Sequence, residues 1–183
     1  MKIAGARPYY DTALAVKAGA DVIVLDGMQG GTAATQEVFI ENVGQPTLAC
    51  IRPAVDALQD LNAHREVQLV ISGGVRNGAD VAKALALGAD AVSIGSAAMI
   101  AIGDNDPKWE KEYQKLGTKA GAYDDWHEGN APAGISTQNP KLMKRLDPKK
   151  AGRKLSNYLK VMTLEAQTIA SCLLYTSDAA DDD

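Results

Sequence analysis

The sequence predicts an α/β fold, the C-terminal half of a (β/α)8 barrel (strands 4 or 5 to 8) with an added C-terminal helix. Short apolar runs recur about every 20 to 25 residues with helical segments between them, which is typical of parallel strands joined by right-handed crossovers. Glycine follows two consecutive runs, at Gly73 and at Gly95, the place of strands 7 and 8 in phosphate-binding barrels. The runs are too few for eight strands, so we favour half a barrel over a small open sheet.

The expected elements alternate along residues 1–103, the barrel portion. Val22–Asp26 is apolar without alternation, which favours a strand covered on both faces. Pro53 suits the first position of a helix. Strands are expected at Met1–Gly5, Val22–Asp26, Thr47–Ile51, Val67–Ser72 and Ala91–Gly95, and helices at Tyr10–Ala18, Ala34–Asn42, Ala54–Asn62 and Gly78–Leu87.

Two stretches of the barrel portion resemble each other. Residues 13–24 and 82–92 each read as a helix, a glycine and then an apolar strand. Glycine is the common residue just past a helix C-terminus, so Gly19 and Gly88 mark where the helices end. The repeat supports a chain built from successive βα units.

The remainder is predicted to be an excursion over the barrel mouth (residues 104–148), a helix (149–170) and a tail (171–183). The excursion should contain a short helix at Trp109–Leu116 and be anchored on the core by Trp109, Tyr113, Tyr123 and Trp126. The apolar stripe of the long helix is expected to pack on the barrel, and it comprises Leu155, Leu159, Met162, Ala166 and Ile169.

The tail (residues 171–183) shows no pattern that predicts a helix or a strand. From Cys172 to Asp183 it resembles the translation of a sequencing-library adapter, so we interpret it as a non-native, disordered segment. The alternative is a disordered acidic tail, and neither interpretation assigns it a function.

Composition excludes several classes of function. The net charge of −4 gives no footprint for nucleic acid or an anionic membrane, and no apolar run is long enough to span a bilayer. The two cysteines, Cys50 in an expected strand and Cys172, cannot form a disulfide framework, so we expect a cytoplasmic protein. His127 lies among acidic residues without ligand spacing, and no metal site is predicted.

The residues themselves predict an anion cradle. Gly73 and Gly74 end one strand, and Gly95 and Ser96 end the next. Backbone without Cβ atoms can approach a phosphate closely, and N–H groups at the following helix starts should point at it.

Three segments carry a family resemblance. They are GADVIVLDGMQGGTAA, SGGVRNGADVAKALALGADAVSIGSAAMIAIG, and AGISTQNPKL followed by NYLKVMTLEAQTIA. Together they resemble the FMN-binding synthase domain of the glutamate synthase family, and most of all its stand-alone members related to the N-methylglutamate synthase FMN subunit. The resemblance covers residues 1–170 and implies that the chain is an N-terminally truncated fragment of an FMN-binding (β/α)8 barrel.

The resemblance implies reductive amination of 2-oxoglutarate by ammonia or methylamine, through an imine that reduced FMN converts to glutamate or N-methylglutamate. It implies a phosphate cradle of Gly73, Gly74, Gly95 and Ser96, and a lysine, Lys2, beside flavin and substrate. Gln29, Gly30, Gly31 and Thr32 would line the pocket. Ser72 could be a flavin contact or a capping hydroxyl. Glutaminase-type and electron-donor subunits are possible partners.

One departure from the wider family concerns its iron–sulfur cluster. The corresponding segments, Gly103–Pro107 and Asn130–Ala133, contain no cysteine, so no cluster is expected here. Two alternatives stay open: an IMP-dehydrogenase-like oxidoreductase, although Gly27–Ala33 lacks the nucleophilic cysteine of that class, and an inactive fragment that only binds phosphate-bearing ligands or partners.

Overall fold

The computed structural model of the chain describes residues 1–30, 38, 42–122 and 128–178. The predictions for Gly31, Thr32, Tyr123, Trp126 and most of the Ala34–Asn42 helix lie outside these residues. The chain divides into two compact units. The first comprises Met1–Gly31, Val38–Ile94 and Lys160–Asp183, and the second comprises Thr32–Glu37 and Gly95–Leu159.

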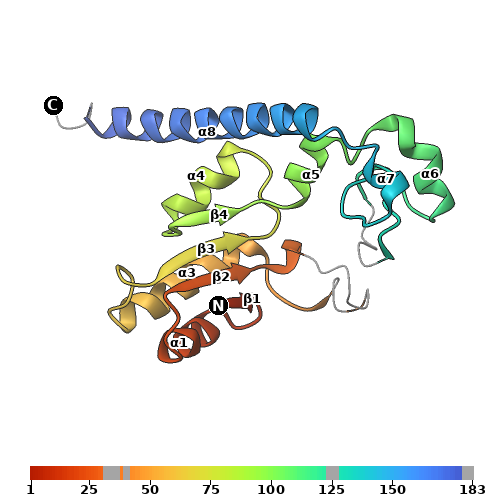
Figure 1. Cartoon of the computed structure of the whole chain (residues 1–183). Helices are drawn as coiled ribbons and strands as arrows, with labels where there is room; N and C mark the ends of the chain where they lie inside the picture. The colour runs from red at the N-terminus through yellow and green to blue at the C-terminus, as the bar shows by residue number, and fades with distance from the viewer. Residues whose placement is uncertain (31–37, 39–41, 123–127, 179–183) are drawn as a thin grey trace. The chain divides into compact units, whose positions relative to one another are not determined.

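The first unit is a parallel sheet with helices between successive strands (Figure 1). Among the described residues it has the strands β1 (Lys2–Ala4), β2 (Val22–Asp26), β3 (Gln68–Ser72) and β4 (Ala91–Ser93), paired in the order β1-β2-β3-β4. Doubly wound sheets reverse their strand order at a switch point, whereas barrels add each strand beside the last. The order observed here is consistent with part of a barrel-type α/β domain.

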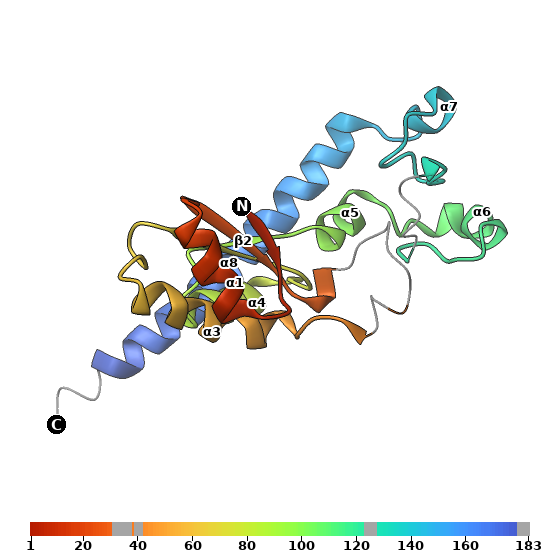
Figure 2. The same ribbon diagram turned by 90° about the horizontal axis from the view of Figure 1, so that it is seen from below.

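The helices α1 (Pro8–Lys17), α3 (Thr47–Asp60) and α4 (Gly78–Ala86) connect these strands. Both views place α1 and α3 side by side (Figures 1 and 2). Gly19 and Gly88 follow α1 and α4 with φ of +82° and +107°, so the glycine stops predicted for both helices are confirmed.

One face of the sheet holds the core. Leu25 and Ile71 are paired in register and are 0% and 1% exposed. On the other face Val24 and Val70 are only half-buried, and Ala91 is exposed. The prediction that Val22–Asp26 is covered on both faces is therefore wrong for the described residues. Buried side chains alternate with more exposed ones along the strand, as in a sheet that is covered on one face.

The strand predicted at Thr47–Ile51 is also wrong, because these residues begin α3. Its buried positions follow a helical period that continues from the predicted strand into the predicted helix: Thr47, Cys50, Ile51, Ala54, Val55 and Leu58. Pro53 lies inside α3 rather than at its start. The carbonyl that loses its N–H partner belongs to Ala49, an exposed residue that water can reach, so the helix tolerates the proline.

The second unit has a small core of its own. It contains α5 (Ser96–Ile102), η2 (Pro107–Trp109), α6 (Glu110–Lys115), α7 (Pro140–Met143) and the start of α8 (Pro148–Asp178). The predicted helix at Trp109–Leu116 corresponds to η2 and α6. Tyr113 is completely buried among Ala131, Ala133 and Ile135, so it anchors this cluster. The prediction that Tyr113 anchors the excursion on the core of the sheet is therefore wrong.

Helix α8 extends to Asp178, beyond the predicted end at Ala170 (Figure 1). Residues 171–178 are therefore helical rather than disordered. Of the predicted stripe, Met162 is buried at 8% exposure, whereas Leu159 is 41% exposed. Within the first unit, α8 packs against the start of α4. There an ideal Cβ on Gly78 would lie 2.3 Å from the Met162 carbonyl oxygen and 2.6 Å from the Ala166 nitrogen.

Candidate functional site

The candidate site lies at the carboxyl ends of β2 and β3 within the first unit, and the Lys2 side chain reaches it from the first residue of β1. Parallel pairing brings the two strand ends to one edge of the sheet, and the N-terminus of α3 joins them. We refer to the residues gathered there as the carboxyl-end cluster: Lys2, Asp26, Gln29, Gly30, Thr47, Ser72, Gly73 and Gly74.

Lys2 and Asp26 form an ion pair on the face of the sheet opposite the core. The Lys2 Nζ atom lies 2.8 Å from Asp26 Oδ2, and the two side chains are 64% and 16% exposed. Lys2 is in register with Val24, so Asp26 is its diagonal neighbour, within reach of a long side chain. The pair places a cation with free N–H groups at the edge where the glycine turns lie.

Gly73 and Gly74 form a turn that only glycine can make at this position. Their φ angles are +109° and +71°. An ideal Cβ on Gly73 would lie 2.7 Å from Thr47 Oγ1, and one on Gly74 would lie 2.9 Å from Gln29 Cβ. No described residue accepts a hydrogen bond from either N–H group. A bare backbone with available donors is what an anion cradle requires.

The Gln29 side chain caps a helix, a role that was not predicted from the sequence. Its Oε1 accepts hydrogen bonds from the Thr47 N–H at 2.7 Å and from the Thr47 hydroxyl at 2.8 Å, which caps the start of α3. The amide oxygen is thereby engaged, and the Nε2 group is what Gln29 has left for a ligand.

Ser72 ends β3 in line with Asp26 and Ser93 across the sheet. Its carbonyl accepts the Gly27 N–H at 3.1 Å and the Thr47 hydroxyl at 3.5 Å. The row Asp26–Ser72–Ser93 puts polar side chains on the face opposite the core, at its carboxyl end. Ser93 was missed from sequence, although its place two residues before Gly95 was the available signal.

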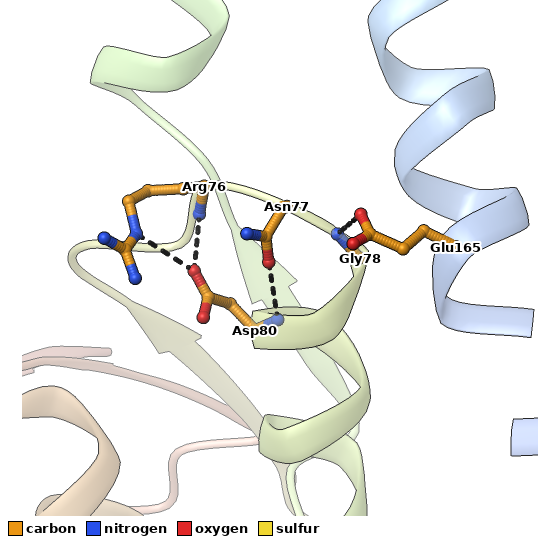
Figure 3. A network of polar contacts seen from close by, with 5 residues as sticks. All are labelled: Arg76, Asn77, Gly78, Asp80 and Glu165. Atoms are coloured by element: carbon orange, nitrogen blue, oxygen red, sulfur yellow. Dashed lines mark hydrogen bonds and ion pairs between the residues drawn. The ribbon is translucent and has the colours of Figure 1, made fainter. Parts of the chain in front are cut away.

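The N–H groups of Gly78 and Asp80 at the start of α4 are bound to side chains of the protein itself, whereas the sequence predicted that N–H groups there point at an anion. Figure 3 shows the hydrogen bonds within the chain: Arg76 N–H to Asp80 Oδ2, Asp80 N–H to Asn77 Oδ1 and Gly78 N–H to Glu165 Oε2, the last at 2.8 Å. The Arg76 guanidinium also pairs with Asp80, at 3.2 Å. Two carboxylates therefore complement the positive end of α4, in place of a ligand.

Comparison with known proteins then decides the family. The model described as "Conserved region in glutamate synthase" matches residues 1–108 and 121–175. The chain belongs to the glutamate synthase family. It is 83% identical over 170 residues to the glutamate synthase large subunit-like protein of Rhizobium meliloti (strain 1021), an alignment that covers 93% of this chain and 38% of the relative.

More distant members of the glutamate synthase family are also similar. The archaeal glutamate synthase [NADPH] of Methanocaldococcus jannaschii is 38% identical over 82% of the chain and 26% of its own length. The archaeal-type glutamate synthase [NADPH] of Dehalococcoides mccartyi is 37% identical over 82% of the chain and 27% of its own length. The chain thus spans roughly a quarter to two-fifths of these relatives.

The other half of the predicted cradle, Gly95 and Ser96, opens the second unit. Gly95 is the N-cap of α5, and no side chain caps that helix. Nothing lies within 4 Å of an ideal Cβ on Gly95, so no neighbouring atom excludes a side chain there, unlike at Gly73. β3 and β4 are parallel with Ser72 opposite Ser93, so both strands end at the same edge of the sheet.

Cys50 and possible metal ligands are the other groups in the chain that could carry chemistry. Cys50 lies in α3, and its thiol is 3.6 Å from the Gln45 carbonyl oxygen. Burial raises the pKa of this thiol, so Cys50 is a buried apolar residue rather than a nucleophile. Within the described ranges, no cluster of three or more histidine, cysteine or acidic side chains could hold a metal. No helix in the part of the chain that the structure describes is long and apolar enough to cross a membrane.

Proposed function

We propose that this chain is the C-terminal half of an FMN-binding (β/α)8 barrel, strands 5 to 8, in a glutamate synthase-type oxidoreductase. The reaction is the reductive amination of 2-oxoglutarate by ammonia or methylamine, which yields glutamate or N-methylglutamate through a 2-imino intermediate. The observation that carries the proposal is the carboxyl-end cluster, where a lysine, an amide and two left-handed glycines meet at one sheet edge in a member of this family.

The carboxyl-end cluster fits the phosphate of FMN. Gly73 and Gly74 offer N–H groups in a turn that has no room for a Cβ, and such a concave backbone binds anions. Gly95 and Ser96, the other phosphate contacts that the family resemblance implies, lie at the start of α5 in the second unit and stay a proposal from the sequence alone. When bound, FMN would supply hydride chemistry.

The chain's own contribution is position and charge. The Lys2 ammonium donates one hydrogen bond to Asp26 and can donate the others to an anionic oxygen of substrate or flavin. The Gln29 Nε2 group, held in place because Oε1 caps α3, can donate to a substrate carboxylate. Ser72 and Gly30 complete the proposed pocket lining, and Gly31 and Thr32, which the family resemblance implies for the same pocket, lie outside the described residues. Cytoplasmic location and glutaminase-type or electron-donor partners remain part of the proposal.

A flavin titration followed by a turnover assay tests this function. The purified chain and the full-length Rhizobium meliloti relative are titrated with FMN, and tight binding is expected at least in the full-length protein. Photoreduced FMN enzyme is then mixed with 2-oxoglutarate and either ammonia or methylamine. Amine-dependent reoxidation supports the proposal and identifies the amine, whereas a full-length protein that binds no FMN overturns it.

A second candidate, ligand binding without catalysis, is favoured for the isolated chain by one observation. On the face of its sheet opposite the core, Val24 and Val70 are half-buried and Ala91 is exposed, and a complete barrel would cover all three. FMN binding without amine-dependent reoxidation by the chain alone would support this candidate.

A further inference from the structure

Asp26 sits between two parts of the proposed site. One carboxylate oxygen, Oδ2, contacts the Lys2 ammonium at 2.8 Å. The other, Oδ1, is buried and accepts no hydrogen bond from any described residue. Its neighbour is Gly30, where an ideal Cβ would lie 2.1 Å from Oδ1 and 2.6 Å from the carboxyl carbon. The carboxylate is thus enclosed by the Gly30 backbone on one side and bonded to the lysine on the other.

This arrangement is costly for stability alone. A buried acceptor without a donor loses its hydration and gains no replacement bond. A diagonal ion pair with one largely exposed partner contributes little to folding. A small apolar residue at position 26 would fill the space under Gly30 without these costs, so the carboxylate is better explained by what it does to Lys2 and to the turn.

We infer that Asp26 is a positioning residue that couples the Lys2 ammonium to the Gln29–Gly30 turn. Its charge holds the ammonium over the open face of the sheet, and its contact with Gly30 sets the turn that carries the Gln29 amide. The two donors are thereby kept at a fixed separation, suited to a ligand with anionic oxygens. That ligand is a 2-oxo dicarboxylate or the anionic reduced flavin, and this assignment rests on the proposed function.

A double-mutant cycle tests the coupling. The variants are Asp26→Asn, Lys2→Met, the double variant and Lys2→Arg, with Asp56→Asn as the control because Asp56 forms an exposed ion pair with Arg52. Dissociation constants for 2-oxoglutarate and, separately and without oxygen, for reduced FMN are measured in the full chain by calorimetry, after circular dichroism has confirmed folding. The two ligands distinguish a substrate role from a flavin role.

Asp26→Asn and Lys2→Met should each lower the affinity for one of the two ligands about tenfold. The double variant should lose no more affinity than Lys2→Met alone. Lys2→Arg should retain most of the affinity, and Asp56→Asn should change nothing. Losses that multiply in the double variant, or an Asp26→Asn protein with unchanged affinities, would overturn the coupling.

A labelling experiment separates this inference from the proposed function. Lys2 in the ligand-free chain is acylated with an N-hydroxysuccinimide ester, and its rate is compared with that of Lys17 by peptide mass spectrometry. Removal of the Asp26 contact should raise the Lys2 rate severalfold relative to Lys17, and an unchanged rate would overturn the pairing. If the wild-type chain bound neither ligand while the labelling contrast persisted, the proposed function would fail and the pairing would stand.

Discussion

At the scale of single residues, the strongest constraint is the left-handed turn at Gly73. Alanine there would have to adopt φ near +109° and would also place its Cβ 2.7 Å from Thr47 Oγ1. Gly19→Ala is the matched control, because Gly19 also has positive φ, +82°, but nothing lies within 4 Å of its ideal Cβ. The left-handed strain alone costs about 1–2 kcal/mol.

We expect Gly19→Ala to lose about that strain, and Gly73→Ala to lose more, because collision is added to strain. Urea denaturation followed by circular dichroism measures both free energies of unfolding. Gly73→Ala should also weaken FMN binding in the full-length relative, whereas Gly19→Ala should not. Equal destabilisation by the two variants would contradict the close packing of Gly73 on Thr47.

Two neighbouring aspartates predict opposite responses to pH. Burial raises the pKa of Asp104, which is 3% exposed, although the hydrogen bond from the Tyr113 hydroxyl opposes part of the effect. Hydrogen bonds from the Lys108 side chain and N–H lower the pKa of Asp106. For Asp104 the folded state holds its proton to a higher pH than the unfolded chain does, so this residue's stabilisation is lost as pH rises through the folded pKa. For Asp106 the stabilisation is lost as pH falls.

The change that isolates the first response is Asp104→Asn, whose side chain can still accept the Tyr113 hydroxyl. Denaturation followed by tryptophan fluorescence between about pH 4 and pH 7 should show a free energy of unfolding that declines with rising pH in the wild type but not in the variant. Asp106→Asn should preserve that decline and remove only a loss of stability at the acidic end. A wild type and Asp104→Asn protein with parallel pH profiles would argue against a buried ionisable group at this position.

At the scale of elements, two features of Gly78 hold α8 against α4: a hydrogen bond from its N–H group and the close approach that its missing side chain allows. The Glu165 carboxylate caps the Gly78 N–H, and the helices approach closely because Gly78 has no side chain (Figure 3). Loss of a helix cap costs about 1 kcal/mol. Glu165→Ala should therefore destabilise the first unit by about that amount, and Glu165→Gln by less, since the amide oxygen can still accept.

Gly78→Ala should have the larger effect, because its Cβ would collide with the α8 backbone. Hydrogen exchange should then show residues 160–178 losing protection in this variant. Gln167→Ala, at an exposed position of the same helix, is the control and should leave the exchange unchanged. Full protection in Gly78→Ala would mean that α8 is not held by this contact.

Element types were predictable where one pattern dominated. The apolar runs of β2 and β3 and the glycine stops after α1 and α4 were visible in the sequence, because strand hydrophobicity and left-handed caps are local properties. The start of α3 was not, because β-favouring residues and Pro53 interrupt a pattern whose helical period appears only over the whole of Thr47–Leu58.

Site contacts were harder to predict for a related reason. The glycine motif and the family resemblance predicted a site at Lys2, Gln29, Gly73 and Gly74, but the contacts of these residues come from elsewhere in the chain. Thr47 engages the Gln29 amide oxygen and Asp26 pairs with Lys2, so motif position fixed where these residues lie and tertiary contacts fixed which atoms remain available.

At the scale of the whole molecule, the open face of the sheet makes a prediction. Val24 and Val70 are half-buried there, and Val22 is 42% exposed, whereas strands of a closed barrel bury their inner residues in layers. An isolated chain with such a face should bind the hydrophobic dye ANS strongly. The full-length Rhizobium meliloti relative, in which further chain can cover the same strands, should bind much less dye per molecule.

A substitution at Val70, on that face, should affect the isolated chain and the full-length relative differently. Val70→Asp introduces a charge that water can solvate in the isolated chain, so the isolated chain should lose dye binding and at most about 1 kcal/mol of stability. In the full-length relative the same change would bury an unpaired charge and should cost several times more. Calorimetric unfolding of both proteins, with and without the substitution, measures the difference. Equal costs in the two proteins would show that this face is open in both, and the half-barrel proposal would fail.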